Sequence, residues 1–239
     1  MRALALLLLL ILPLDARAAE PVDLALVLVS DVSRSIDDSE FQMQKQGYAA
    51  AFSDPRVLTA IRNGAIGAIA VAYVEFAGSY EVRTVVDWRI IRDPASARAM
   101  TDFMAAAPRS FWGRTSISAG VDRAMQMLAE APVETTRRVI DVAGDGTNNA
   151  GRDITAARDD AVQAGVTING LAIINDHPIS YTYAHVAPPG GLAEWYRNNV
   201  IGGPGSFVVE VHDFAAFGEA MTRKLINEIA SRAEGKSPS

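Results

Sequence analysis

The chain has 239 residues, of which 49% are apolar and 21% are charged, and its 22 basic and 28 acidic side chains give a net charge of −6. This length and composition fit one globular domain with a sizeable core and exclude a disordered chain. The negative charge argues against a protein that binds nucleic acid by neutralising phosphates. The lack of cysteine excludes disulfide scaffolds, thiolate metal sites, cysteine nucleophiles and a lipid anchor on cysteine.

The N-terminus has the features of an export signal. Arg2 precedes an apolar run that ends at Leu14 and is shorter than the ~20 residues needed to cross a bilayer. Ala16-Arg17-Ala18 is a small-x-small cleavage pattern, so we expect residues 1–18 to be a signal peptide. Cleavage after Ala19 is the alternative.

Removal of this signal defines the expected mature protein. The signal contains two arginines and one aspartate, so its loss changes the net charge from −6 to −7. We expect one domain over residues 19–232 and a flexible tail over residues 233–239. The sequence has no second long apolar run, so we expect a periplasmic or secreted protein without a membrane span after cleavage.

Apolar runs and segments of helical spacing alternate along the rest of the chain. We expect strands over residues 22–30, 67–76, 80–88, 139–143, 167–174 and 207–211. We expect helices over residues 39–52, 55–61, 94–107, 116–130, 154–164, 192–199 and 214–232. The alternation predicts an α/β fold with a doubly wound, mostly parallel sheet flanked by helices, in which residues 80–88 form one antiparallel edge strand.

Three segments carry small oxygen-bearing side chains at the predicted carboxyl ends of strands. The first strand ends in Asp31-Val32-Ser33-Arg34-Ser35, in which an aspartate and two serines alternate. Thr115 precedes a helix in Gly113-Arg114-Thr115-Ser116, and Asp145 follows a strand between Gly144 and Gly146. Carboxylate and hydroxyl oxygens are ligands for hard cations such as Mg²⁺, Mn²⁺ or Ca²⁺. Aspartate and serine are also ordinary turn and helix-cap residues, so the first segment alone does not decide the matter.

The order of these segments resembles a von Willebrand factor A domain with a metal-ion-dependent adhesion site. The resemblance covers roughly residues 22–232. It implies a non-enzymatic module without catalytic residues, in which a cation, most simply Mg²⁺ with Mn²⁺ or Ca²⁺ as alternatives, accepts an Asp or Glu from a partner protein. The metal ligands that it implies are Asp31, Ser33, Ser35, Thr115 and Asp145. The stretch Asp141-Val142-Ala143-Gly144-Asp145-Gly146-Thr147-Asn148-Asn149 and the signal also resemble a bacterial family of exported proteins of unknown function.

Two positions depart from the pattern of that family. Arg34 stands between the two serines, where glycine is common, and a cation there would weaken metal binding unless it points to solvent or meets a carboxylate. We expect Arg34 either to contact the acidic partner or to pair with Asp37 or Asp38 and hold the loop. Gly144 stands where relatives carry threonine or serine, which puts in doubt a supporting hydrogen bond from that position.

Three other functions remain open. Gly144–Asn149 resembles a late motif of haloacid-dehalogenase-like phosphatases with Asp31 as nucleophile, but Ser33 stands where that chemistry needs a second carboxylate. A serine hydrolase is favoured only by a faint match at residues 116–120. The third alternative is a structural domain whose metal site has no function.

One long connection separates the last two predicted strands. Residues 175–206 are rich in proline and glycine around the predicted helix 192–199. Its aromatic side chains are expected either to form an interface beside the metal site or, for Trp195 and Tyr196, to pack as a lid over the edge of the sheet. The residues considered for the interface are Tyr181, Tyr183, Trp195 and Tyr196.

Overall fold

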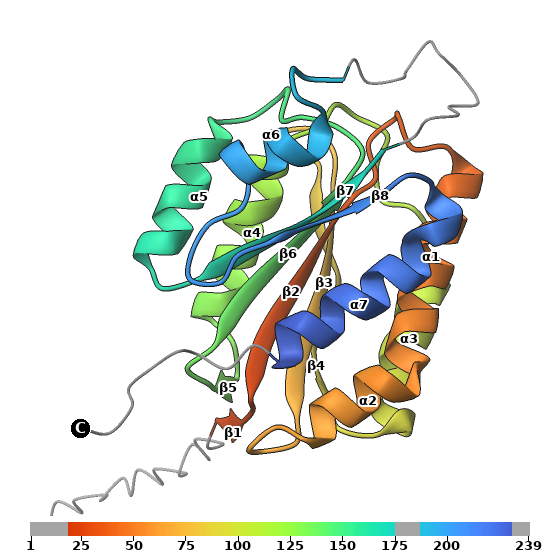
Figure 1. Cartoon of the computed structure of the whole chain (residues 1–239), viewed down its shortest axis with the longest axis vertical. Helices are drawn as coiled ribbons and strands as arrows, with labels where there is room; N and C mark the ends of the chain where they lie inside the picture. The colour runs from red at the N-terminus through yellow and green to blue at the C-terminus, as the bar shows by residue number, and fades with distance from the viewer. Residues whose placement is uncertain (1–18, 175–186, 231–239) are drawn as a thin grey trace, which may run out of the picture.

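The computed structural model describes residues 19–174 and 187–230, which form a sheet between two layers of helices (Figure 1). The six-stranded sheet has the order β4-β3-β2-β6-β7-β8, and only the pairing of β4 with β3 is antiparallel. Its strands are β2 (Leu24–Asp31), β3 (Ile69–Phe76), β4 (Val82–Ile91), β6 (Arg138–Gly144), β7 (Thr167–Ile173) and β8 (Val208–Val211). This architecture confirms the predicted α/β class and its antiparallel edge strand.

The helices are divided between the two faces of the sheet. One face is covered by α1 (Asp38–Ser53), α2 (Pro55–Arg62), α3 (Pro94–Ala106), the short 3₁₀ helix η1 (Phe214–Ala216) and α7 (Phe217–Ala230). The other face is covered by α4 (Ile117–Ala129), α5 (Ile154–Gln163) and α6 (Leu192–Asn199).

The central strand β2 shows why the sheet needs both layers. All eight of its residues are buried. Leu24, Leu26 and Leu28 pack against the α1–α7 layer, whereas its alanine and two valines pack against the α4–α6 layer. The alternation follows from the opposite directions of successive side chains in a strand. A strand covered on both faces is apolar throughout, as the sequence of β2 is.

The strand order reverses at β2. The chain passes from β2 to β3 and β4 on one side, and then crosses to β6, β7 and β8 on the other. The loops that follow β2 and β6 therefore leave the sheet in different directions, which is the topology that forms a ligand-binding crevice in α/β sheets. This crevice lies at the carboxyl ends of the strands, uppermost in Figure 1, where Asp31 and Asp145 are found.

The structure differs from the predicted elements mainly in its shortest strands and at the ends of some elements. β1 (Glu20–Pro21) and β5 (Val133–Glu134) form a separate two-stranded parallel sheet that was not predicted, because two residues are too few for a periodic pattern. The edge strand β4 extends to Ile91, beyond the predicted end at residue 88. The last predicted helix is divided into η1 and α7.

Several predictions lie outside the described residues. These are the signal peptide over residues 1–18, the tail over residues 233–239 and the roles of Tyr181 and Tyr183. Within residues 19–174 and 187–230, no helix is long and apolar enough to cross a membrane.

A buried cluster of charged groups joins α7 to the sheet. The Lys224 ammonium lies 2.7 Å from Asp141 Oδ1 and 2.5 Å from Glu228 Oε1, and all three side chains are at most 2% exposed. The Asn169 amide donates a further hydrogen bond of 2.9 Å to Glu228 Oε1. Two carboxylates therefore share one ammonium. Burial, followed by the charge of Asp141, raises the pKa of Glu228 to about 7.

We predict that Glu228 makes the stability of the fold depend on pH. Because its pKa is higher in the folded than in the unfolded chain, the folded state holds more protons between pH 4.5 and 7, and stability from this group falls as pH rises through that range. The Glu228→Gln variant should remove this fall, which is on the order of 3 kcal/mol at most. Urea unfolding between pH 5 and 8 measures it.

The matched control for this prediction is Glu219→Gln on the same helix. Glu219 pairs with Arg56 at the surface, and its side chain is 57% exposed. Its variant should keep the pH dependence of the natural protein. Parallel stability curves for the natural protein and the Glu228→Gln variant would contradict the prediction.

Candidate metal site

The loop after β2 turns back on its own aspartate. The backbone N–H of Ser33 donates a 2.7 Å hydrogen bond to Asp31 Oδ1. Asp31 and Ser33 are both almost fully buried, whereas Arg34 is exposed and Ser35 is half-buried. Of the two residues between these side chains, Arg34 is exposed to solvent, whereas Val32 packs into the hydrophobic core.

Arg109 holds the backbone of this loop. Its guanidinium donates hydrogen bonds to the carbonyl oxygens of Val32, at 2.8 Å, and Ser33, at 2.6 Å. It also donates to Phe111 O at 3.0 Å and forms an ion pair of 3.4 Å with Asp38. Arg109 therefore braces the backbone of this loop, and the role of Arg34 stays a prediction.

The structure brings the five predicted ligands together in one chain of hydrogen bonds. Thr115 Oγ1 donates to Ser33 Oγ at 3.1 Å, and Ser33 Oγ lies 3.2 Å from Ser35 Oγ. Ser35 Oγ donates to Asp145 Oδ1 at 2.9 Å. Asp31 joins this chain through its bond from the Ser33 backbone. Residues from three distant parts of the sequence thus place carboxylate and hydroxyl oxygens around one point.

The second carboxylate oxygen of Asp31 is buried without a hydrogen-bond partner among the described residues. Burial, and then the charge of Asp145, raise the pKa of Asp31 to about 8, while the bond from Ser33 and the charge of Arg109 oppose that rise. An ionised carboxylate in the interior is costly unless a cation compensates it. The donor set of hydroxyls and carboxylates suits Mg²⁺, Mn²⁺ or Ca²⁺. The residues present therefore fit a hard divalent cation.

Asn149 is a residue of this site that the sequence reasoning missed. Its side-chain Oδ1 accepts a 3.0 Å hydrogen bond from the Thr115 N–H, and its own N–H donates to Thr115 O at 2.8 Å. This reciprocal pairing fixes the backbone of Thr115 relative to the loop after β6. The polar run Thr147-Asn148-Asn149 could have indicated this role, because asparagine side chains often form hydrogen bonds with backbone groups of loops.

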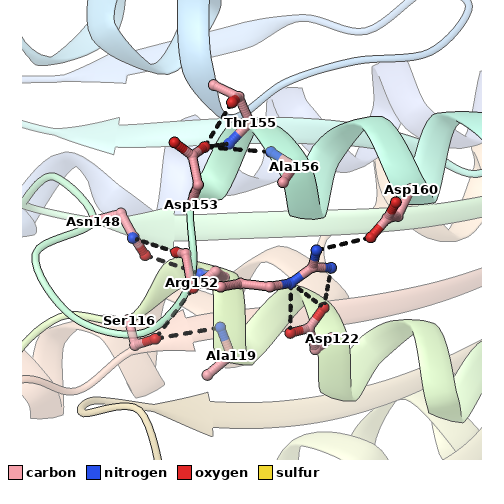
Figure 2. Close-up of polar contacts among 10 residues, drawn as sticks. Ser116, Ala119, Asp122, Asn148, Arg152, Asp153, Thr155, Ala156 and Asp160 are labelled. Carbon is pink, nitrogen blue, oxygen red and sulfur yellow. Dashed lines mark hydrogen bonds and ion pairs between the residues drawn. The ribbon is translucent and has the colours of Figure 1, made fainter.

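Asn148 and Arg152 secure the same loop farther from the crevice (Figure 2). Asn148 Oδ1 accepts from the Ser118 N–H at 3.0 Å, and its Nδ2 donates to Arg152 O at 3.1 Å. The Arg152 guanidinium forms ion pairs with Asp122 of α4, at 2.6 Å, and Asp160 of α5, at 2.8 Å. The loop after β6 is thereby tied to the two helices beside it.

Gly151 permits this arrangement. Its φ of 78° lies in the left-handed region. A Cβ built on Gly151 would lie 2.2 Å from Ser116 Oγ, and Ser116 caps α4 by accepting a hydrogen bond from the Ala119 N–H. A larger residue would therefore disturb both the loop and the start of α4, whose cap residue Ser116 directly follows Thr115.

One protein family and several solved structures resemble this chain. The family model described as "Protein of unknown function (DUF1194)" matches residues 21–233. The chain belongs to this family. A search of curated proteins found no match for this DUF1194 member.

Solved structures with the same fold include proximal thread matrix protein 1 from the mussel byssus, which is 16% identical with a TM-score of 0.61 over 89% of this chain and 49% of that one. A von Willebrand factor type A protein from Catenulispora acidiphila is 15% identical, with a TM-score of 0.58 over 87% of this chain and 43% of that one. The pilus adhesin SpaC from Lactobacillus rhamnosus is 14% identical, with a TM-score of 0.58 over 88% and 31%.

These neighbours show that the DUF1194 chain has the fold of a von Willebrand factor A domain, as the sequence predicted. The chain spans about half or less of the length of each of them. In another structure of the mussel protein, zinc occupies the metal-ion-dependent adhesion motif. The identity of the five ligands in the present chain stays a prediction.

We predict that Asn149→Ala destabilises the protein by about 1–3 kcal/mol, because the buried Thr115 N–H would lose its acceptor. Urea unfolding of the purified protein without added metal measures this change. Thr147→Ala is the control, since Thr147 lies in the same loop but makes no side-chain hydrogen bond to the described residues. Equal stability of the two variants would show that Asn149 does not hold Thr115.

Proposed function

We propose that the protein is an exported, non-enzymatic binding module that holds a divalent cation and, through it, an acidic side chain of a partner protein. The proposed ligands are Asp31, Ser33, Ser35, Thr115 and Asp145, with Mg²⁺ as the expected cation and Mn²⁺ or Ca²⁺ as alternatives. The observation that carries the proposal is the buried, unpartnered Oδ2 of Asp31 beside a second aspartate and three hydroxyls. Protein interiors rarely leave a carboxylate oxygen in this condition without an ion or a water.

The composition of the ligand set favours binding of another protein's carboxylate. Three of the five proposed ligands are neutral hydroxyls, so the site carries at most two negative charges. Bound there, the cation would supply a Lewis-acidic position that accepts a carboxylate oxygen from outside. Half-buried Ser35 and Asp145 mark the side of the site that is accessible to such a group.

The structural neighbours are consistent with a binding function. One is named a matrix protein and one a pilus adhesin, and zinc occupies the adhesion motif of the matrix protein. The last residue of the phosphatase motif is an aspartate, but this chain has Asn149 there, and its side-chain oxygen accepts a hydrogen bond from the Thr115 N–H. Ser33 supplies a hydroxyl where that chemistry needs a second acid. Both features favour binding over catalysis.

We predict that 1 mM Mg²⁺ raises the melting temperature of the natural protein by about 3–6 °C. A dissociation constant of ~0.1 mM would stabilise the fold by roughly 1.4 kcal/mol, which corresponds to a shift of that size in a domain of this length. Differential scanning calorimetry with Mg²⁺ and with EDTA measures it. The Asp31→Ala/Asp145→Ala double variant should show no shift.

The control for this prediction is Asp153→Ala. Asp153 caps α5 by accepting hydrogen bonds from the N–H groups of Thr155 and Ala156 (Figure 2) and is not among the hydrogen-bonded residues of the proposed site. This variant should melt at a lower temperature but keep the full response to Mg²⁺. The same Mg²⁺ response in the natural protein and in the double variant would refute the metal assignment.

We predict that Arg34→Ala weakens capture of acidic partners without changing the Mg²⁺ response. Arg34 is exposed between two proposed ligands, its backbone N–H is fixed to Gly113 O, and Arg109 already braces the loop. A guanidinium beside the cation would attract a carboxylate in spite of the negative net charge. Affinity capture from envelope extract, run in parallel with Mg²⁺ and with EDTA, measures partner binding.

Arg98→Ala controls for the loss of one surface charge, because the Arg98 side chain is 82% exposed on α3. It should leave both capture and the Mg²⁺ response unchanged. Reduction of the Mg²⁺ response by Arg34→Ala would mean that Arg34 holds the loop. Unchanged capture with Arg34→Ala would remove this residue from the binding surface.

A further inference from the structure

Gly144, the residue before Asp145, faces a space that another side chain already fills. A Cβ built on Gly144 would lie 2.8 Å from Tyr196 Oη, 3.1 Å from Asp31 Cβ and 3.2 Å from Asp31 Oδ2. The phenol of Tyr196 therefore occupies the volume that a side chain at position 144 would take. Its hydroxyl and Asp31 Oδ2 lie on the same side of the Gly144 backbone.

Tyr196 reaches this point across two strands. It belongs to α6, whose buried side also includes Leu192 and Ala193. Its ring passes over Gly170 of β7, where a Cβ would lie 2.8 Å from Tyr196 Cδ1. Gly170 is paired with Val142 of β6, two residues before Gly144. The two glycines thus leave a path on the sheet for the ring and its hydroxyl.

The hydroxyl of Tyr196 has no hydrogen-bond partner among the described residues, and neither has Asp31 Oδ2. Tyr196 is fully buried, and a buried hydroxyl without a partner is costly. Burial, and then the charges of Asp31 and Asp145, raise the pKa of Tyr196 well above its usual value. The phenol therefore keeps its proton and is available as a hydrogen-bond donor.

We propose that Tyr196 is a positioning residue of the metal site, whose hydroxyl donates a hydrogen bond to Asp31 Oδ2. This inference rests on the proposed function, because it treats Asp31 as a metal ligand. The Ser33 N–H already donates to Oδ1, whereas Oδ2 and the phenol have no partner among the described residues. The proposed bond would give each oxygen of Asp31 a donor from the protein. The carboxylate is then held in one orientation toward the three hydroxyls.

This arrangement gives Gly144 a physical explanation. The hydroxyl that a threonine or serine at position 144 would provide comes instead from α6, about fifty residues farther along the chain. A glycine at 144 is then required, since any side chain there would displace the phenol. Tyr196 is buried, as the prediction of a lid over the sheet requires. The proposed hydrogen bond gives its hydroxyl a second role.

The first test is the affinity of purified protein for Mg²⁺ alone, measured by isothermal titration calorimetry. Tyr196→Phe should weaken binding about tenfold or more, the usual effect of losing a hydrogen bond to a metal ligand. The metal-free variant should be at least as stable toward urea as the natural protein, because the removed hydroxyl was buried there without a partner among the described residues.

Tyr73→Phe is the control for this test. Tyr73 is also fully buried, and its hydroxyl donates to Glu75 Oε1 at 3.3 Å, outside the chain of hydrogen bonds that joins the five proposed ligands. It should leave the affinity for Mg²⁺ unchanged. Unchanged affinity in Tyr196→Phe, whether or not its stability falls, would overturn the positioning role. Absence of Mg²⁺ binding by the natural protein would instead refute the proposed function.

A second test needs no metal. Gly144→Ala should be strongly destabilising in the natural protein because its Cβ meets Tyr196 Oη. Combined with Tyr196→Phe, the same change should cost much less, since the phenol oxygen is gone. Unfolding of the four proteins in a double-mutant cycle measures this coupling. Additive effects would show that the hydroxyl does not occupy the space beside Gly144 and would overturn the inference.

Discussion

The carboxylate of Asp31 is the constraint around which the crevice is organised. It lies at the end of the central strand, fully buried, with the charge of Asp145 nearby. Burial and like charge both oppose its ionisation. A parallel sheet nevertheless gathers such groups, because the loops after β2 and β6 open at the same edge and diverge there. The residues around Asp31 serve to hold this unfavourable group in place.

The supporting residues act mainly on backbone atoms. Arg109 binds the carbonyl oxygens of the loop after β2, and Asn149 pairs with both backbone groups of Thr115. Arg152 fixes the loop after β6 through α4 and α5. Because these contacts fix the backbone, the side chains of Ser33, Ser35 and Thr115 keep their oxygens directed toward the crevice. A site of hydroxyl ligands needs such support, since each hydroxyl alone binds a cation weakly.

The sequence predicted the elements and pointed to the five proposed ligands, but not to the residues that support them. Continuous apolar runs identified the buried strands, and the motif from Asp31 to Ser35 identified the end of the first one, because both signals are local. The contact of Arg109 with Val32 spans 77 residues and leaves no periodic trace. Tyr196 was assigned only to burial or an interface, since its partner is an oxygen far away in the sequence. In the sequence, Gly144 indicated the loss of a supporting hydrogen bond. In the structure, the phenol of Tyr196 fills the space of the missing side chain.

The two buried aspartates of the sheet, Asp141 and Asp31, have different surroundings. Four residues before Asp145 on the same stretch of chain, Asp141 shares the ammonium of Lys224 with Glu228, so the protein supplies the cation for that pair. Asp31 Oδ2 has no donor among the described residues, and the Arg109 guanidinium binds carbonyl oxygens and Asp38. We propose that a cation from outside takes this role for Asp31. Tyr196 and Ser33 can direct that carboxylate, but as neutral donors they cannot replace the missing charge.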